Sequence, residues 1–253
     1  MPDDPTPLPF LAPCRTLPAA APLGWVRRGW QDLRRAPGPS LAYGAVIVAL
    51  SWGVTGIGLW MGSYWAVLVL LSGFVFVAPV LALGLYSISR QLGANLRPTL
   101  RRCFAEQKRS LGTAMVFALA LLVVFLVWAR AGSMLHVFFP VHARPDWTEL
   151  AGFLTIGSAV GSVFALVTFA FSAFSLPMIC DRDADAITAV VTSVNAVLRN
   201  KPAMVTWVLL IVGLTAVGFA TALLGLAVTI PLLGYATWHG YRETIDASAW
   251  PGH

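Results

Sequence analysis

Long apolar stretches alternate with short polar, charged segments along most of this chain. A run of about 20 apolar residues is long enough to cross the hydrocarbon core of a bilayer. The pattern therefore predicts an all-α, polytopic membrane protein with six transmembrane helices. The expected spans cover about 40–60, 64–88, 111–129, 150–179, 203–223 and 226–241. The last two are divided at a turn near Leu224 and Gly225, and the alternative is one span with an interfacial extension.

The polar segment over residues 174–202 predicts a surface helix between two spans. Asp183 or Asp185 is suited to cap its N-terminus, because a carboxylate accepts hydrogen bonds from free backbone N–H groups there. Apolar and polar residues then recur at helical spacing on opposite faces. The apolar face comprises Ile187, Val190, Val191, Val194 and Val197, and the polar face comprises Thr188, Thr192, Asn195 and Arg199. We expect this amphipathic helix to lie in the membrane interface or to fold back against the bundle.

Two more amphipathic helices are predicted on the same side, over residues 23–35 and within residues 90–109. Both carry basic residues that suit contact with anionic lipid head groups or with a partner protein. The candidate contact residues are Arg27, Arg28, Arg34, Arg35, Arg101 and Arg102.

The domain organisation predicted is one membrane domain over 23–245 between two cytoplasmic tails. Residues 1–22 hold seven prolines and no periodicity, which predicts a disordered tail. Residues 246–253 form a short C-terminal tail. The order of interfacial helix, span, turn and span suggests a threefold parallel repeat, with Pro79, Pro177 and Pro231 in the second span of each unit.

The charge distribution adds an orientation to this pattern. The chain has 253 residues, of which 58% are hydrophobic and 11% charged, against about 25% charged in soluble domains. Of the 17 lysines and arginines, all but Arg130 and Arg144 fall on one side of the predicted bundle. By the positive-inside rule both termini are cytoplasmic, and the net charge of +6 does not indicate binding to nucleic acid. Cys14, Cys103 and Cys180 lie on the same side, where thiols stay reduced.

The chemistry-bearing residues exclude several classes of function. No ionisable residue falls in the middle of a predicted span, which argues against a proton-coupled transporter. Four histidines are too few, and wrongly placed, for a haem–copper centre. His136 and His142, with Asp146 and Glu149, allow an outer-face metal site, but a polar loop with aromatic anchors explains them as well. We therefore expect no catalytic residues, no cofactor and no metal.

Three smaller features leave alternatives open. Asp181, Asp183 and Asp185 resemble the start of a calcium loop, but its glycine and final glutamate are missing; a helix cap or a partner-binding patch remains. Gly157 and Gly161 form a small-residue motif that suits close helix packing within the bundle, or docking to another copy or protein. Gly218 and Ala222 repeat that spacing. His239 is either an interfacial hydrogen-bonded residue or a functional one.

Four segments carry a resemblance to a known family. They begin at Trp30-Gln-Asp-Leu, Pro79-Val-Leu-Ala-Leu-Gly-Leu-Tyr, Leu176-Pro-Met-Ile-Cys-Asp and Pro231-Leu-Leu-Gly-Tyr-Ala-Thr-Trp. Together they make residues 23–245 resemble the domain of unknown function family 2189, a group of predicted bacterial integral membrane proteins. The resemblance implies a multi-pass protein of the bacterial inner membrane and brings no activity or catalytic residue.

Two functions fit these observations. The first is a non-enzymatic scaffold or accessory protein that associates with another membrane complex, a second copy or anionic lipid. The second is a channel or facilitator for a small neutral solute, and a membrane enzyme is a distant third. Convergence of the hydroxyl side chains of spans 1, 2, 5 and 6 on one water-accessible cavity would favour the facilitator.

Overall fold

The computed structural model describes residues 9–61, 81–138 and 147–252, and their regular secondary structure is helical. The helices are α1 (Ala21–Arg35), α2 (Pro37–Met61), α4 (Leu100–Phe138), α5 (Trp147–Ser172), α6 (Ser175–Asp181), α7 (Ala186–Arg199), α8 (Lys201–Ala220) and α9 (Leu226–Thr244). A further helix covers residues 81–93. The predicted all-α class is thus confirmed for the described residues.

Four of the described helices contain stretches long and apolar enough to cross a membrane. These are Pro37–Gly58, Leu100–Met134, Thr155–Asp181 and Lys201–Ala220. They coincide with the first, third, fourth and fifth predicted spans. Most of the second predicted span lies outside the described residues, and the sixth corresponds to α9. The six-span count and the threefold repeat therefore stay predictions.

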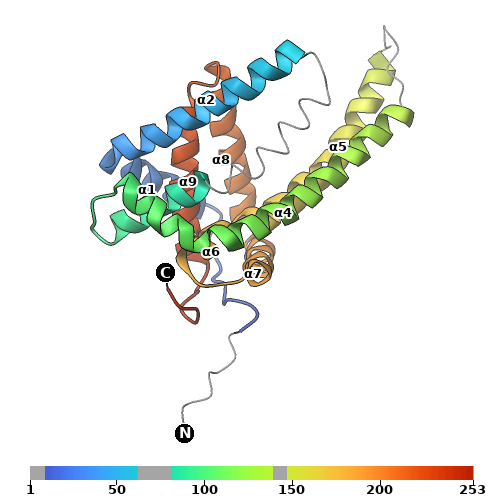
Figure 1. Ribbon diagram of the computed structural model, residues 1–253. Helices are drawn as coiled ribbons and strands as arrows, with labels where there is room; N and C mark the ends of the chain where they lie inside the picture. Colours follow the sequence, from blue (N-terminus) through green and yellow to red (C-terminus); the bar gives the residue numbers. More distant parts are fainter. Residues whose placement is uncertain (1–8, 62–80, 139–146, 253) are drawn as a thin grey trace.

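Helix α9 lies at the centre of the body, with α1, α2, α6 and α8 packed against it (Figure 1). Glycines permit the closest of these contacts. A Cβ atom at Gly29 of α1 would lie 2.9 Å from the backbone nitrogen of Ala236, and one at Gly44 of α2 would overlap the backbone of Ala227. Because only glycine lacks that atom, these positions set how closely α1 and α2 approach α9.

Helices α4 and α5 form a hairpin that projects from this body (Figure 1). Helix α4 is continuous over Leu100–Phe138, so the separate interfacial helix predicted within 90–109 is wrong. The chain instead turns after residue 93, with Asn95 at a φ of 57°, and the basic residues form the first turns of the spanning helix. At its other end α4 continues to Phe138, beyond the predicted end of the third span at residue 129.

A turn over residues 221–225 separates α8 from α9, with positive φ angles at Ala222 and Leu223. Ala222 therefore lies in the turn and does not continue a small-residue stripe along α8. Gly218 does pack between α8 and α9, where an added Cβ would meet Leu226.

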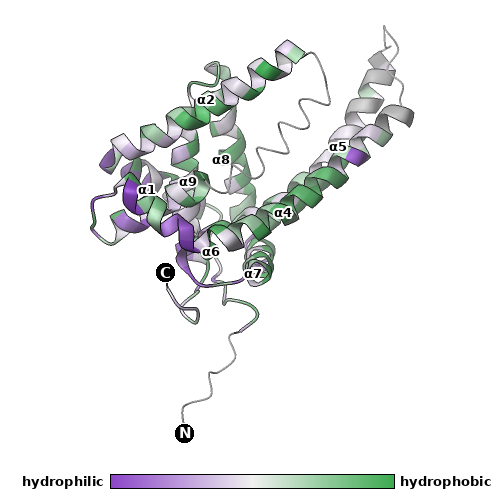
Figure 2. Cartoon of the chain, in the orientation of Figure 1, coloured by the Kyte–Doolittle hydropathy of each residue, from purple (hydrophilic) through white to green (hydrophobic). Residues whose placement is uncertain are grey.

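The core of the body is built around Trp25, which is fully buried. Its ring makes edge-on contacts with Phe174 at 6.1 Å and with Trp207 at 5.5 Å between ring centroids. Polar residues gather at the end of the body near α1 and α6, while α2, α4 and α8 are largely apolar (Figure 2). We call this polar end the foot of the bundle.

Helix α7 packs on the body mainly through small residues. Thr188, Thr192 and Ser193 are buried, whereas Ile187 is 65% exposed. The Ser193 hydroxyl donates to the Ala170 carbonyl oxygen at 2.8 Å, and accepts from the Phe174 amide at 3.1 Å. Of the predicted apolar face, Val190 and Val197 are only partly buried against the core.

The prediction of disorder over residues 1–22 is wrong for residues 9–22; residues 1–8 lie outside the described part. Residues 9–20, which we call the N-terminal strap, lie across α7 and the end of α9. The Ala12 amide donates to Thr192 Oγ1 at 3.2 Å, and the Arg15 amide donates to the Thr244 carbonyl at 2.8 Å. Asn200, which is 1% exposed, accepts from the Leu17 amide at 2.7 Å and donates to the Arg15 carbonyl at 3.0 Å.

The C-terminal tail is also packed rather than free. The Asp246 amide donates to the Pro13 carbonyl at 2.9 Å, and the Asp183 amide donates to the Pro251 carbonyl at 2.9 Å. Trp250 is 3% exposed. The described ends of the chain thus lie together at the foot of the bundle (Figure 1).

Of the two residues predicted to cap α7, Asp185 makes the capping hydrogen bonds. Its Oδ1 accepts from the amides of Ile187 and Thr188, both at 2.9 Å, and its Oδ2 accepts from the Thr188 hydroxyl at 2.6 Å. Burial acts to raise the pKa of Asp185, but these hydrogen bonds outweigh it and hold the pKa below its ordinary value.

We expect Asp185→Ala to destabilise the protein by about 1 kcal/mol at pH 7, through loss of the cap. A lowered folded-state pKa gives stability that is full above the unfolded value of about 3.9 and is lost as the pH falls through the folded pKa. The advantage of Asp185 over Ala should therefore shrink in acid. Thermal unfolding in detergent, followed by tryptophan fluorescence, measures it. Asp183→Ala is the control, and equal stability of the two variants at pH 7 would contradict the capping role.

We expect Asn200→Ala to release the N-terminal strap, because one side chain holds both Leu17 and Arg15. Tryptic cleavage after Arg15 in detergent should become several-fold faster, as cleavage follows local opening. Val205→Ala, at a position of α8 that is 61% exposed, is the control. Unchanged cleavage in Asn200→Ala would show that the strap is held by its other contacts.

Candidate functional site

A cluster of buried charged and polar side chains occupies the foot of the bundle. Asp181, the last residue of α6, is its centre and is 8% exposed. Its Oδ2 accepts from the Tyr241 hydroxyl at 2.9 Å, from Nη1 of Arg242 at 3.0 Å and from Nε of Arg182 at 3.2 Å. Arg182 also donates through Nη1 to the Trp250 carbonyl at 3.0 Å. The carboxylate therefore joins α6, α9 and the C-terminal tail.

Arg90 extends the cluster to the helix over residues 81–93. Its Nη1 donates to the Cys180 carbonyl at 3.0 Å, and its Nη2 lies 2.7 Å from Oε2 of Glu106 on α4. Ser87 donates to the same carboxylate. Burial acts to lower the pKa of Arg90, but the hydrogen bond and charge of Glu106 outweigh it and raise the pKa. The guanidinium is thus held in its charged form.

Asp32 ties α1 into the same end of the bundle. Its Oδ2 accepts from the Ser89 hydroxyl at 2.6 Å and lies 2.8 Å from Nε2 of His239 on α9. Serine and histidine bond to the same carboxylate oxygen, rather than to each other. In a nucleophilic triad the histidine must instead take the proton of the serine. The arrangement therefore positions helices and does not activate Ser89.

Two carboxylates of this cluster are paired with guanidiniums: Asp181 with Arg182 and Arg242, and Glu106 with Arg90. The third, Asp32, is held by Ser89 and His239. Buried charges are tolerated when they are paired and hydrogen-bonded. The cluster joins segments that lie up to about 200 residues apart in sequence, so it acts as a clasp between helices. We refer to it below as the charge clasp.

The structure separates the three aspartates that the sequence placed together. Asp181 points inward to the clasp, Asp183 is exposed, and Asp185 caps α7. They do not form one patch, and no group of three or more potential metal ligands occurs among the described residues. His142 and Asp146 of the suggested outer metal site lie outside the described part of the chain.

The candidate lipid-contact residues lie mainly at the surface. Five are exposed: Arg27, Arg34, Arg35, Arg101 and Arg102. Arg28 is the exception, because its guanidinium pairs with Glu243 of α9. His239 is drawn into the clasp by Asp32.

Gly157 and Gly161 make no close contact inside the described bundle. A Cβ atom added at either glycine would meet nothing within 4 Å. The neighbouring side chains of Val163 and Leu166 on α5 are 60% and 63% exposed. The small-residue motif is therefore not used for packing among the described residues, which leave it open on the projecting hairpin.

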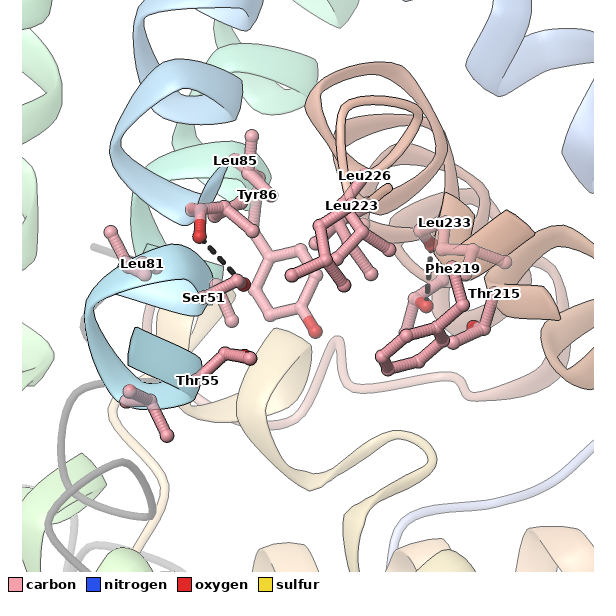
Figure 3. A pocket seen from close by; sticks show the side chains of 16 residues that line it. Ser51, Thr55, Leu81, Leu85, Tyr86, Thr215, Phe219, Leu223, Leu226 and Leu233 are labelled. Carbon is pink, nitrogen blue, oxygen red and sulfur yellow. Dashed lines mark hydrogen bonds between the residues drawn. The ribbon is translucent and has the colours of Figure 1, made fainter. Parts of the chain in front are cut away.

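An apolar cavity of about 540 Å³ lies between α2, residues 81–93, α8 and α9 (Figure 3). Leucine, isoleucine, valine and phenylalanine make up most of its wall. Five hydroxyl residues also line it: Ser51, Thr55, Tyr86, Thr215 and Thr237. The Ser51 and Thr237 hydroxyls donate to the carbonyls four residues earlier, at 2.8 and 2.7 Å.

Sequence reasoning missed Asp32, Glu106, Asn200 and the cavity. Asp32 had a usable signal, because Trp25, Gly29 and Asp32 recur at helical spacing and all three are buried. A carboxylate on the apolar face of a basic helix such as α1 indicates that a hydrogen-bonding partner is buried with it. The partners of Glu106 and Asn200 are distant in sequence and carry no local signal.

We expect Asp181→Asn to destabilise the protein by about 3 kcal/mol, the low end for breaking a buried charge pair. The reason is that Arg182 and Arg242 lose their counter-charge, while the half-exposed Arg242 is partly rehydrated. Thermal unfolding in detergent measures the loss. Asp183→Asn, which removes an exposed carboxylate, should change stability by less than about 0.5 kcal/mol; similar losses in both variants would contradict the clasp.

Comparison with known proteins agrees with the resemblance read from the sequence. The family model "Predicted integral membrane protein (DUF2189)" matches residues 66–181. The matched part covers less than half of the chain and contains Arg90, Glu106 and Asp181 of the clasp. It excludes the segments beginning at Trp30 and Pro231. Neither a search of curated proteins nor a search of solved structures gave a significant match.

Proposed function

We propose that this integral membrane protein is a non-enzymatic accessory protein that docks a transmembrane helix of a partner, or of a second copy, on its α4–α5 hairpin. The observation that carries the proposal is the open surface at Gly157 and Gly161, with nothing within 4 Å of an added Cβ. In a bilayer, helices associate through close van der Waals packing, and small residues allow their backbones to approach. An exposed small-residue motif on a projecting hairpin has the form of such a contact.

The charge clasp supports a structural rather than a catalytic role for the foot of the bundle. Its carboxylates and guanidiniums are engaged with one another, and its serine is not activated. A rigid foot would hold the hairpin in a fixed direction, as a scaffold requires.

We further propose a location in the bacterial inner membrane with six crossings and cytoplasmic termini. The packing of the N-terminal strap against the C-terminal tail supports an even number of crossings. The basic residues around the foot support its cytoplasmic placement. The exposed Arg27, Arg34, Arg35, Arg101 and Arg102 would then favour anionic lipid, by about 1 kcal/mol for each residue near the surface.

One observation favours the facilitator as a second candidate. Hydroxyl residues from the first, second, fifth and sixth predicted spans line a single cavity. Its wall is nevertheless mostly apolar, and cavities of this kind stay dry. A dry cavity suits an apolar occupant better than the passage of a polar solute, so the accessory role is the stronger proposal.

We expect Gly157→Leu to abolish co-purification of a stoichiometric membrane partner, or to dissociate a homo-oligomer, because leucine keeps the backbones apart. The tagged protein is extracted from its native membrane with a gentle detergent, and co-purifying proteins are identified by mass spectrometry. Gly53→Leu on α2 is the matched control, since that glycine is also open. A wild-type monomer without a partner would contradict the proposal, and solute flux in liposomes would then test the facilitator.

A further inference from the structure

The apolar cavity is bordered by helices that could cross a membrane. Two of the helices around it, α2 and α8, contain candidate membrane spans. Thr55 and Phe219 lie in the later parts of those spans, whereas Tyr86 is one turn from Arg90 of the charge clasp. At a rise of about 1.5 Å per residue, Tyr86 lies roughly 6 Å along its helix from that polar end. The cavity therefore extends from near the interface toward the bilayer interior.

Tyr86 is the distinctive polar group in this cavity. It is 6% exposed, and its ring stacks on Trp238 with 6.4 Å between centroids and 24° between planes. Figure 3 shows the ring in the middle of the site, between Ser51 and Thr55 on one side and Phe219 and Leu223 on the other. Its hydroxyl makes no hydrogen bond with another described residue, unlike those of Ser51 and Thr237. Its oxygen is not among the fully enclosed, unpartnered polar atoms of the described residues, so the hydroxyl is open to the cavity and can donate to a ligand or a water there.

The cavity thus offers long apolar walls and a hydrogen-bond donor, the Tyr86 hydroxyl, toward its polar end. Its volume of about 540 Å³ falls within the range of roughly 300–1,000 Å³ for small-molecule sites. A long hydrocarbon chain with one carbonyl at its end matches this arrangement.

We propose that this cavity binds one acyl chain of a bilayer glycerolipid, with the ester carbonyl oxygen accepting a hydrogen bond from Tyr86 Oη. The ester group of a lipid lies at the interface and its chain runs into the bilayer interior. That direction is the one in which the cavity runs from Tyr86 toward Thr55 and Phe219. The site is distinct from the docking surface on α5 and does not depend on it.

The test uses a phosphatidylethanolamine whose acyl chain carries a photoreactive diazirine, incorporated with the full-length protein in nanodiscs. After illumination, labelled peptides are mapped by mass spectrometry. Labelling should concentrate on the cavity-lining parts of α2 and α8, around Ser51–Thr55 and Thr215–Phe219. Uniform labelling of lipid-exposed positions such as Leu209 and Val212, which are 66% and 59% exposed, would overturn the proposal.

Two variants separate the acyl site from non-specific contact. Thr55→Phe fills the cavity and should abolish labelling of its lining, whereas Val205→Phe, at a position of α8 that is 61% exposed, should leave it unchanged. Tyr86→Phe keeps the ring and its stacking but removes the donor. It should weaken retention of the lipid by about two- to tenfold, the effect of one net hydrogen bond, and it keeps the test decisive if Thr55→Phe fails to fold.

Organic extraction of the purified protein identifies the natural occupant. One glycerolipid per protein, reduced in Tyr86→Phe and absent from Thr55→Phe, supports the proposal. A bound isoprenoid quinone in its place, or equal lipid content in wild type and Thr55→Phe, overturns it. Because Gly157 is intact in these variants, partner docking is assayed independently, and failure of one proposal is distinguishable from failure of the other.

Discussion

The pairing of carboxylates with guanidiniums at one end of the helices, Asp181 with Arg182 and Arg242 and Glu106 with Arg90, is the constraint on which the rest of this structure depends. Asp181, which is 8% exposed, would cost several kcal/mol if it were buried without a partner. The ends of α6 and α9, the helix over residues 81–93 and the start of α4 must therefore meet at one level so that Asp181, Arg90 and Glu106 find their partners. The N-terminal strap and the C-terminal tail then cover this end of the bundle.

Glycine serves two opposite purposes in this chain. Gly29 and Gly44 are crowded, and their missing side chains set the separation of α1 and α2 from α9. Gly157 and Gly161 are open on the projecting hairpin. Small residues on a helix can therefore serve contacts within the bundle or contacts with another protein. The open glycines of α5 are the physical basis of the accessory role that we propose.

The sequence predicts the helical class, the candidate spans and the cap of α7 because these follow from local pattern. A run of apolar residues favours a membrane span, and a carboxylate before a helix favours a capping hydrogen bond, whatever the rest of the chain does. The direction in which α7 packs could not be predicted in the same way. In a membrane protein, apolar side chains can face lipid, so the amphipathic pattern of Thr188 and Ile187 does not say which side meets the protein.

The candidate site was predictable only in part. Asp181 and His239 were identified from sequence, but their partners were not, because Arg242 lies 61 residues from Asp181 and Asp32 lies 207 residues from His239. The N-terminal strap was misjudged for the same reason. Its proline-rich composition predicts no regular structure, yet Asn200 and Thr192 supply hydrogen bonds that composition cannot reveal.

The most direct test of the charge clasp is a double-mutant cycle between Asp181 and Arg242. The free energy of unfolding is measured in detergent for wild type, Asp181→Asn, Arg242→Gln and the double variant. If the two side chains act as a coupled pair, the double variant is more stable than the sum of the single losses predicts, by more than about 0.5 kcal/mol. Additivity within about 0.5 kcal/mol would contradict the account, because the two residues would then contribute independently.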